Sequence, residues 1–194
     1  MFGKKRISKV QFIALGFLII IITGTILLML PVSSRDGQAT GFLDALFTAT
    51  SASCVTGLVV VDTYSHWSLF GQIVIICMIQ VGGLGFISLG VVLALMLRRR
   101  ISLRHRGLMQ ESVNTLQIGG IVRLTKKMLI GTLIFEGIGA IILAVRFSFM
   151  MSPARAVFYG IFHSISAFCN AGFDLLGCYG EYNSLCGFEG DWTI

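Results

Sequence analysis

Two short stretches of the chain combine small residues, hydroxyls and a closing glycine, which is a composition suited to chemistry by backbone carbonyls. The first, LFTATSASCVTGL, covers residues 46–58 and contains Val55, Thr56 and Gly57. It carries no charge and lies between two long hydrophobic runs. It is too short and too polar to span a bilayer, and lipid cannot satisfy its backbone groups. The segment therefore predicts a re-entrant pore loop that is surrounded by protein or faces a water-filled path.

An extended backbone at Val55, Thr56 and Gly57 could point its carbonyl oxygens at an alkali cation and replace the cation's water shell. Glycine permits the backbone angles that such a turn needs. The preceding residues predict a short helix from Asp44 to about Ser53, whose partly negative C-terminus would favour a cation at the same place. The alternative is that Gly57 only ends this helix as its cap. We favour an ion selectivity filter, with carbonyl oxygens and no fixed metal site.

The same pattern returns 115 positions later as IFHSISAFCNAGF, residues 161–173. Internal repeats between hydrophobic helices are typical of transport proteins, whose sites form where the repeats meet. The repeat predicts a second short helix, from Arg155 to Phe168, and a second filter segment at Asn170, Ala171 and Gly172. The five identical pairs are Phe47 with Phe162, Ser51 with Ser166, Ala52 with Ala167, Cys54 with Cys169, and Gly57 with Gly172.

The elements that must hold these segments are membrane helices. With 55% hydrophobic residues, 12% charged residues and a mean hydropathy of +0.87, the chain lies far from the composition of soluble proteins. Three hydrophobic runs, at residues 10–30, 69–97 and 128–145, are long enough to span a bilayer. The first is too long for a secretory signal and has no small-x-small cleavage site behind it. We expect an all-α polytopic membrane protein of repeated helix, re-entrant pore loop, helix units.

The charges predict the orientation of the chain. The net charge of +6 is concentrated in a basic N-terminus (Lys4, Lys5, Arg6, Lys9) and in the middle of the chain, between residues 98 and 127, whereas most acids follow the first and third runs. Excess Lys and Arg marks the cytoplasmic side, so we expect a cytoplasmic N-terminus and pore loops that enter from outside. Trp67 then falls at the outer boundary of the membrane. Two basic clusters beside membrane helices favour lipid as the partner and exclude nucleic acid.

Three regions follow from this pattern. Residues 1–97 form the first complete repeat, residues 98–127 a cytoplasmic basic linker, and residues 128–194 a second repeat that lacks its final membrane helix. The linker has an approximate apolar helical stripe beside its basic residues. Such a stripe fits anionic lipid or a cytosolic subunit, and the sequence leaves both open.

Several polar and small residues allow two interpretations. Glu136, near the centre of the third run, either lines the ion path or has a structural partner, and we favour the partner because Glu136 belongs to neither loop. Gly82, Gly83, Gly85 and Gly90 favour close helix packing, since a phosphate-binding loop would need a βαβ setting.

The histidines and cysteines give weaker signals. We expect His66 at the surface and His163 in helix packing, neither as a metal ligand. Cys178 and Cys186 share a predicted external loop, where a disulfide is an open alternative. Acids in that loop would attract cations. An intramembrane enzyme is unsupported because no Ser/His pair, paired Asp or metal-ligand cluster is present.

The combination of TATSASCVTGL, WSLFGQIVIICMIQVGGLGF, LIFEGIGAIIL and FHSISAFCNAGFDLLG in this order resembles the first half of the pore-forming, KtrB-type subunit of the Ktr/Trk/HKT potassium-uptake superfamily. The resemblance runs over nearly the whole chain. Members of this superfamily resemble four fused copies of a helix, pore loop, helix unit around one pore. Each copy contributes one filter glycine, and Gly57 and Gly172 match the first two.

The resemblance implies uptake of K⁺ as the transported ion, Na⁺ as an activator, a homodimer of full-length pore subunits and a KtrA-like cytosolic nucleotide-binding ring. Copies three and four are missing from the pattern, so we expect a truncated chain that does not conduct alone. The rival hypothesis is a membrane scaffold or assembly subunit that uses the same helices only to bind partners.

Overall fold

A computed structural model describes residues 9–85, 121–180, 182, 184 and 190, and within this part of the chain every regular element is helical. A single isolated bridge joins Ser34 to Trp67. The elements are α1 (Lys9–Met29), η1 (Pro31–Ser33), α2 (Phe42–Cys54), α3 (Thr63–His66), α4 (Leu69–Leu84), α7 (Ile121–Ser148), α8 (Pro153–Phe168) and η2 (Leu176–Tyr179).

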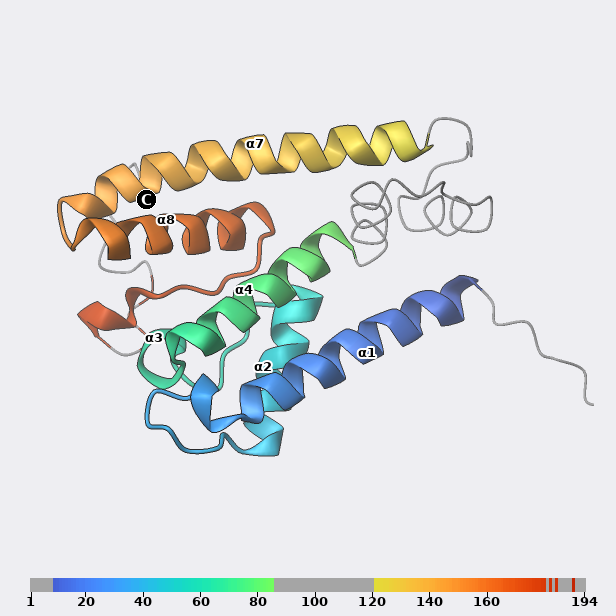
Figure 1. Cartoon of the computed structure of the whole chain (residues 1–194), viewed down its shortest axis with the longest axis horizontal. Coiled ribbons are helices and arrows are strands. Elements are labelled where there is room, and N and C mark those ends of the chain that lie inside the picture. The colour runs from blue at the N-terminus through green and yellow to red at the C-terminus, as the bar shows by residue number, and fades with distance from the viewer. Residues whose placement is uncertain (1–8, 86–120, 181, 183, 185–189, 191–194) are drawn as a thin grey trace, which may run out of the picture.

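The helices form two groups that meet at α4. In Figure 1, α1, α2 and α4 lie together, α7 and α8 run side by side above them, and α4 passes between the groups. Local sequence explains where the short helices begin. Asp44 occupies the first turn of α2, and Pro153 opens α8 at the position where a fixed φ and a missing N–H cost nothing. Each group thus contains one short helix held against at least one longer one.

The first group is packed around small residues. Ala45, Ala49 and Ala52 of α2 are completely buried, and side chains of this size let helix backbones approach closely in a membrane. Leu28 of α1 and Ile75 of α4 fill the same core. Helix α2 therefore packs its small-residue face against the apolar helices α1 and α4, while Leu43 and Phe47 on its other side are exposed.

Trp67 belongs to this core, whereas the sequence predicts only that its ring suits the outer boundary of the membrane. Its side chain is fully buried, and its ring meets that of His66 edge-on at 4.7 Å. The cause is the turn of α3, which returns the chain onto η1 through the bond from Ser68 N to Ser33 O, 2.9 Å. His66 is half-buried as well, with its Nε2 3.0 Å from Thr40 Oγ1, so it is not a fully exposed surface residue.

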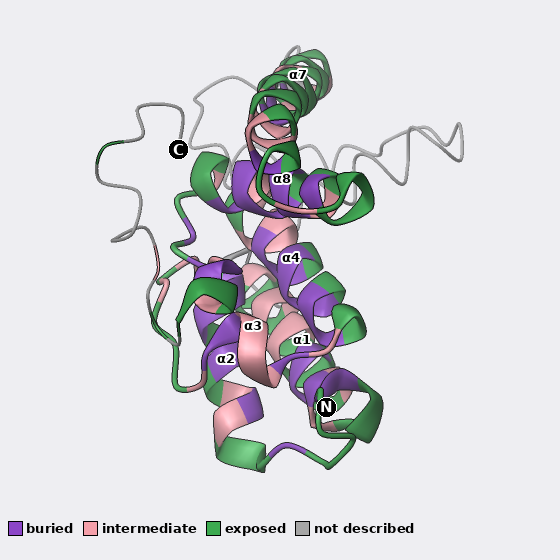
Figure 2. Cartoon of the chain, turned by 90° about the vertical axis from the view of Figure 1, so that its left-hand side faces the viewer, coloured by how far each residue is buried: buried purple, intermediate pink, exposed green. Residues whose placement is uncertain are grey.

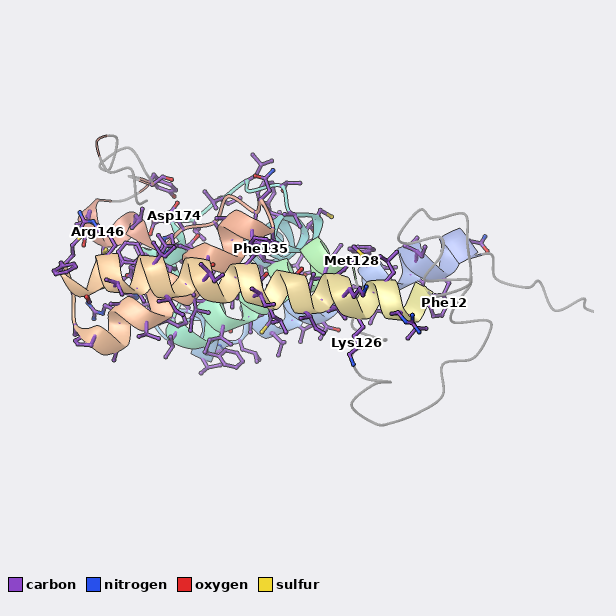
Figure 3. The ribbon with its side chains drawn as sticks, turned by 90° about the horizontal axis from the view of Figure 1, so that it is seen from above. Phe12, Lys126, Met128, Phe135, Arg146 and Asp174 are labelled. Atoms are coloured by element: carbon purple, nitrogen blue, oxygen red, sulfur yellow. The ribbon has the colours of Figure 1, made fainter. Side chains whose placement is uncertain are left out.

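In the described part of the chain, two helices are long and apolar enough to cross a membrane, at Gln11–Met29 and Val122–Ser148. Their apolar side chains face outward: Figure 2 shows the exposed flank of α7, where Leu133 and Phe135 are each 67% exposed. Figure 3 shows Lys126 toward one end of α7 and Arg146 toward the other. A long apolar exposed surface between basic ends suits hydrocarbon and not water.

Helix α4 ends at Leu84, with Gly85 as its cap, whereas the predicted run continues to residue 97, and residues 86–97 lie outside the described part of the chain. The other predicted helix boundaries agree with the structure to within two residues except at α7. Helix α7 begins at Ile121, seven residues before the predicted Met128, so Arg123, Lys126 and Lys127 of the predicted linker belong to the helix. Lys and Arg are good helix formers and can extend their charges toward water, so they do not end a helix.

Several expectations concern residues outside the described part of the chain. These are the basic N-terminus, residues 86–120 with their arginines, Gly90 and the apolar stripe, and Cys186. Cys178 is a free thiol. The division into 1–97, 98–127 and 128–194 stays a prediction.

Candidate functional site

The two predicted filter segments follow α2 and α8 with nearly the same backbone. Val55 and Asn170 are left-handed, with φ of 57° and 58°, and two residues later Gly57 and Gly172 have φ of 74° and 72°. The equivalent positions are 115 residues apart, as in the sequence repeat. The repeat therefore has a structural counterpart in the turns that end both short helices.

The hydrogen bonds of these turns also match in pairs. Thr56 N donates to Ser51 O at 3.0 Å, and Ala171 N donates to Ser166 O at 2.7 Å. The left-handed residues donate three positions back, from Val55 N to Ala52 O and from Asn170 N to Ala167 O. This pair of bonds is the usual way for a left-handed residue to close a helix.

Val55 and Asn170 are thus the residues that close the helices, and the glycines come after them. The alternative in which Gly57 caps α2 is wrong, because the cap is complete at Val55. The left-handed angles of both glycines must serve the turn beyond the cap.

Gly57 and Gly172 lie against each other. A Cβ on Gly57 would be 2.8 Å from Ala171 O and 3.2 Å from Gly172 Cα, and one on Gly172 would be 3.1 Å from Gly57 Cα. No other residue type fits both the space and the backbone angles at these positions. The structure therefore brings the two predicted segments together at Gly57, Ala171 and Gly172, with glycine required at the contact.

The surroundings favour positive charge. The segments directly follow the C-termini of α2 and α8, where unpaired carbonyls give a partial negative charge. Thr56, Asn170 and Gly172 are exposed, whereas Ala171 is buried. Within the described residues no group of His, Cys, Asp and Glu could hold a metal ion. Backbone oxygens and hydroxyls are the oxygen ligands that this place offers.

Side chains fasten each segment differently. In the first, Thr56 Oγ1 donates to Ser51 Oγ at 2.9 Å. In the second, Ser166 Oγ donates to Phe173 O at 2.6 Å, and Leu175 N donates to His163 Nε2 at 3.2 Å. The sequence predicts His163 only in helix packing, because no local spacing signals its bond to Leu175, which lies 12 residues away and just beyond the second segment.

The helices that pack against α2 and α8, namely α4 and α7, are joined by a polar pair. Gln80 Nε2 of α4 donates to both carboxylate oxygens of Glu136 of α7, at 2.9 and 3.0 Å. Ser164 Oγ of α8 donates to the backbone carbonyl of the same glutamate at 2.7 Å. The partner expected for Glu136 is therefore Gln80.

Two hollows lie beside these elements. One, about 260 Å³, is lined by residues of α7, α8 and the second segment, including Phe147, His163, Asn170 and Asp174. The other, about 360 Å³, is a polar cleft lined by Asp36, Val61, Asp62, Ser65, His66 and Tyr182. Asp62 there accepts hydrogen bonds from Tyr64 N, Ser65 N and Tyr182 N, so it ties α3 to the chain beyond η2.

Two long, exposed apolar helices among the described residues, each packed against a short helix, define an integral membrane protein. Residues 7–189 match the TrkH family, described as cation transport proteins, and the chain belongs to this family. The prediction of a KtrB-type member is confirmed.

Three curated relatives illustrate the similarity. The potassium/sodium uptake protein NtpJ of Enterococcus hirae is 44% identical over 90% of this chain and 39% of its own length. The Ktr system potassium uptake protein B of Bacillus subtilis is 41% identical over 97% of this chain and 41% of its own length. The protein of the same name from Vibrio alginolyticus is 43% identical over 89% of this chain and 37% of its own length. The chain thus spans about two fifths of the length of these relatives.

Proposed function

We propose that this protein is a pore-forming part of a channel-like transporter that takes up K⁺ across the cell membrane. Relatives at 38 to 44% identity are named potassium or potassium/sodium uptake proteins, which supports K⁺ as the transported ion. The transport is non-enzymatic. The carbonyls of Val55, Thr56, Gly57, Asn170, Ala171 and Gly172 supply part of the selectivity filter, and the loops that carry them re-enter the membrane.

One observation carries this proposal: two segments far apart in the sequence adopt the same turn and meet at Gly57 and Gly172. Repeated half-helices that meet at mid-membrane are the arrangement from which transporters build ion sites. A ring of backbone oxygens can replace the water shell of a dehydrated alkali ion. The matched turns are suited to present such oxygens from both repeats.

Electrostatics supports a cation as the cargo. The C-terminal ends of α2 and α8 point partial negative charge at the filter. The polar cleft adds the carboxylates of Asp36 and Asp62, and clustered carboxylates raise the local concentration of cations. On this proposal the cleft faces outward, the N-terminus is cytoplasmic and the chain crosses the membrane several times.

The remaining parts of the proposal extend the family resemblance. Residues 1–97 are one helix, pore loop, helix unit, and residues 128–194 are the helix and pore loop of a second, joined to the first by residues 98–127 on the cytoplasmic side. The pore subunit works as a homodimer on a KtrA-like nucleotide-binding ring, and Na⁺ activates it. The Ktr system names of the relatives support assembly with other subunits.

The test is to replace each contact glycine by alanine in the full-length protein. Each variant is expressed with the regulatory subunit in bacteria that lack other K⁺ uptake systems. Gly57→Ala and Gly172→Ala each place a Cβ against the opposite segment at an unfavourable φ. We expect growth on low K⁺ and initial K⁺ uptake to fall at least about tenfold, which corresponds to roughly 1.4 kcal/mol.

Gly37→Ala is the matched control. Gly37 has the same kind of backbone angle, with φ of +68°, but open space where a Cβ would stand. It therefore carries the backbone cost of alanine without the clash, and uptake should stay near the original value. Normal K⁺ uptake by both filter variants, at equal amounts of protein in the membrane, would refute the filter.

A further inference from the structure

The chain after Gly172 is fixed by two side chains of α8 that lie on one face of that helix. Ser166 Oγ donates to Phe173 O, and His163 Nε2 accepts from Leu175 N. Residues three apart in a helix are neighbours on its surface, so both bonds reach the same stretch of backbone. Phe173 and Leu175 are themselves buried, at 2% and 0% exposure.

The bonds of His163 define its protonation state. Its Nε2 receives the N–H of Leu175 and must carry a lone pair, while its Nδ1 lies 2.8 Å from Tyr159 O and must carry the proton. This is the neutral Nδ1–H tautomer, with both nitrogens satisfied. The ring is enclosed by aromatic neighbours, with the centroid of Phe147 at 5.4 Å and that of Phe162 at 5.9 Å. His163 is thus held in one orientation by packing and by its own helix.

The first repeat fastens its segment in another way. The position equivalent to His163 is Thr48, which is also buried, and within the described part of the chain it makes no hydrogen bond to the residues after Gly57. The first segment is instead tied inside the turn, through Thr56 and Ser51. The histidine bond is therefore specific to the second repeat.

We propose that His163 is a positioning residue of the second filter segment: its Nε2 fixes the backbone at Leu175 and so sets the place of the Asn170–Gly172 carbonyls. This inference rests on the proposed filter function. The bond at Leu175 N holds the backbone three residues after Gly172. The bond from Ser166 holds the backbone at Phe173, which directly follows Gly172. Without the imidazole acceptor, a buried N–H would lose its partner, and the exit of the filter would relax.

The consequence is a role in ion binding beyond a role in folding. Ion selectivity depends on how well the coordinating oxygens keep their number and spacing. A displaced second segment would weaken K⁺ binding and discrimination against Na⁺, while leaving the helices in place. The expected signature is a raised KM for K⁺ with a smaller change in Vmax.

The experiment compares two substitutions of similar size in the intact transporter with its regulatory subunit. His163→Leu fills the site but removes the acceptor. His163→Gln keeps an oxygen near the position of Nε2 that can accept from Leu175 N. Thr48→Val is the control at the equivalent position of the first repeat. K⁺ uptake kinetics, uptake in competing Na⁺ and thermal stability in detergent are measured for each.

We expect His163→Leu to raise the KM for K⁺ about tenfold and to lose K⁺/Na⁺ discrimination, His163→Gln to restore both, and Thr48→Val to leave both unchanged. The inference is overturned if His163→Leu keeps the original KM and discrimination. It is also overturned if the leucine and glutamine variants lose stability equally with no change in kinetics, because that result assigns His163 to packing alone. Failure of the filter itself is read separately, from normal uptake by the Gly57 and Gly172 variants.

Discussion

Val55 and Asn170 occupy the same left-handed position with very different side chains. Asn adopts this conformation readily, whereas a β-branched residue there is an outlier that costs free energy. The structure keeps Val55 in place because its half-buried side chain packs against the core. Packing of Val55 thus offsets the backbone strain in the first turn. In the second turn, Asn170 adopts the left-handed conformation at little cost.

This difference predicts the effect of moving valine to the second repeat. Asn170 is exposed, so Asn170→Val gains little from burial and pays the left-handed cost of about 1–2 kcal/mol. We expect a thermal midpoint in detergent several degrees lower. Asn170→Gly, which suits the same angles, should leave the midpoint within about two degrees. Equal midpoints for the two variants would show that the left-handed turn is not kept in the folded protein.

At the scale of single residues, the sequence predicts which two segments meet but not which bonds hold them. Repeated glycines after small polar residues are a local signal, and the structure places these residues in contact. Neither the cap at Val55 nor the bond from Leu175 to His163 has such a signal. Valine disfavours the left-handed conformation that the cap at Val55 requires. The bond from Leu175 to His163 forms only once the helices have packed.

Helix α4 brings the two short helices together through adjacent glycines. Gly82 lies directly against the backbone of Ser53, at the end of α2, and a Cβ on it would overlap the Ser53 carbonyl. A Cβ on Gly83 would be 2.6 Å from Cys169 Sγ, just after α8. The packing role predicted for these glycines is thus seen at both. One helix touches the ends of both short helices next to the filter segments.

Gly82→Ala should therefore be costly although alanine is the better helix former. The new methyl group meets a backbone carbonyl that cannot turn away, and overpacking of this kind costs about 1–3 kcal/mol. We expect a lower thermal midpoint and reduced K⁺ uptake. Gly137→Ala in α7 is the control, because its Cβ would meet open space. A Gly82→Ala protein as stable and active as the control would contradict the close contact.

Most helix positions follow from hydrophobic runs and helix-starting residues, because membrane helices are set by length and apolarity. Helix α4 is an exception, since it ends at Leu84 although the apolar run continues to residue 97. The helix predicted from Asp44 to Ser53 lies within two residues of the observed ends of α2, Phe42 and Cys54. The hydrophobic run does not mark the start of α7, because the helix begins before the run and includes Arg123 and Lys127. Burial of Trp67 was missed because an amphipathic ring suits both a core and a boundary.

Across the whole molecule, the two repeats are joined at depth by Gln80 and Glu136. The carboxylate is 6% exposed and accepts both hydrogen bonds from one amide. Polar groups inside a membrane protein that pair across helices stabilise their arrangement. The pair lies between α4, which touches both α2 and α8, and α7, which packs along α8. It therefore ties together the helices that hold Gly57 against Gly172.

If this pair is structural, its two members should depend on each other. Gln80→Leu leaves the buried carboxylate without its partner and should cost about 1–3 kcal/mol of stability. Leucine at both positions should cost less than the sum of the two single changes, with a coupling of at least about 0.5 kcal/mol. Thermal midpoints of the four proteins in detergent measure this coupling.

Glu136→Gln keeps an amide–amide pair and removes the charge, so K⁺ uptake should persist. Loss of uptake in Glu136→Gln at an unchanged midpoint would place the glutamate in the ion path instead, because only a charge acting on the ion would be missing.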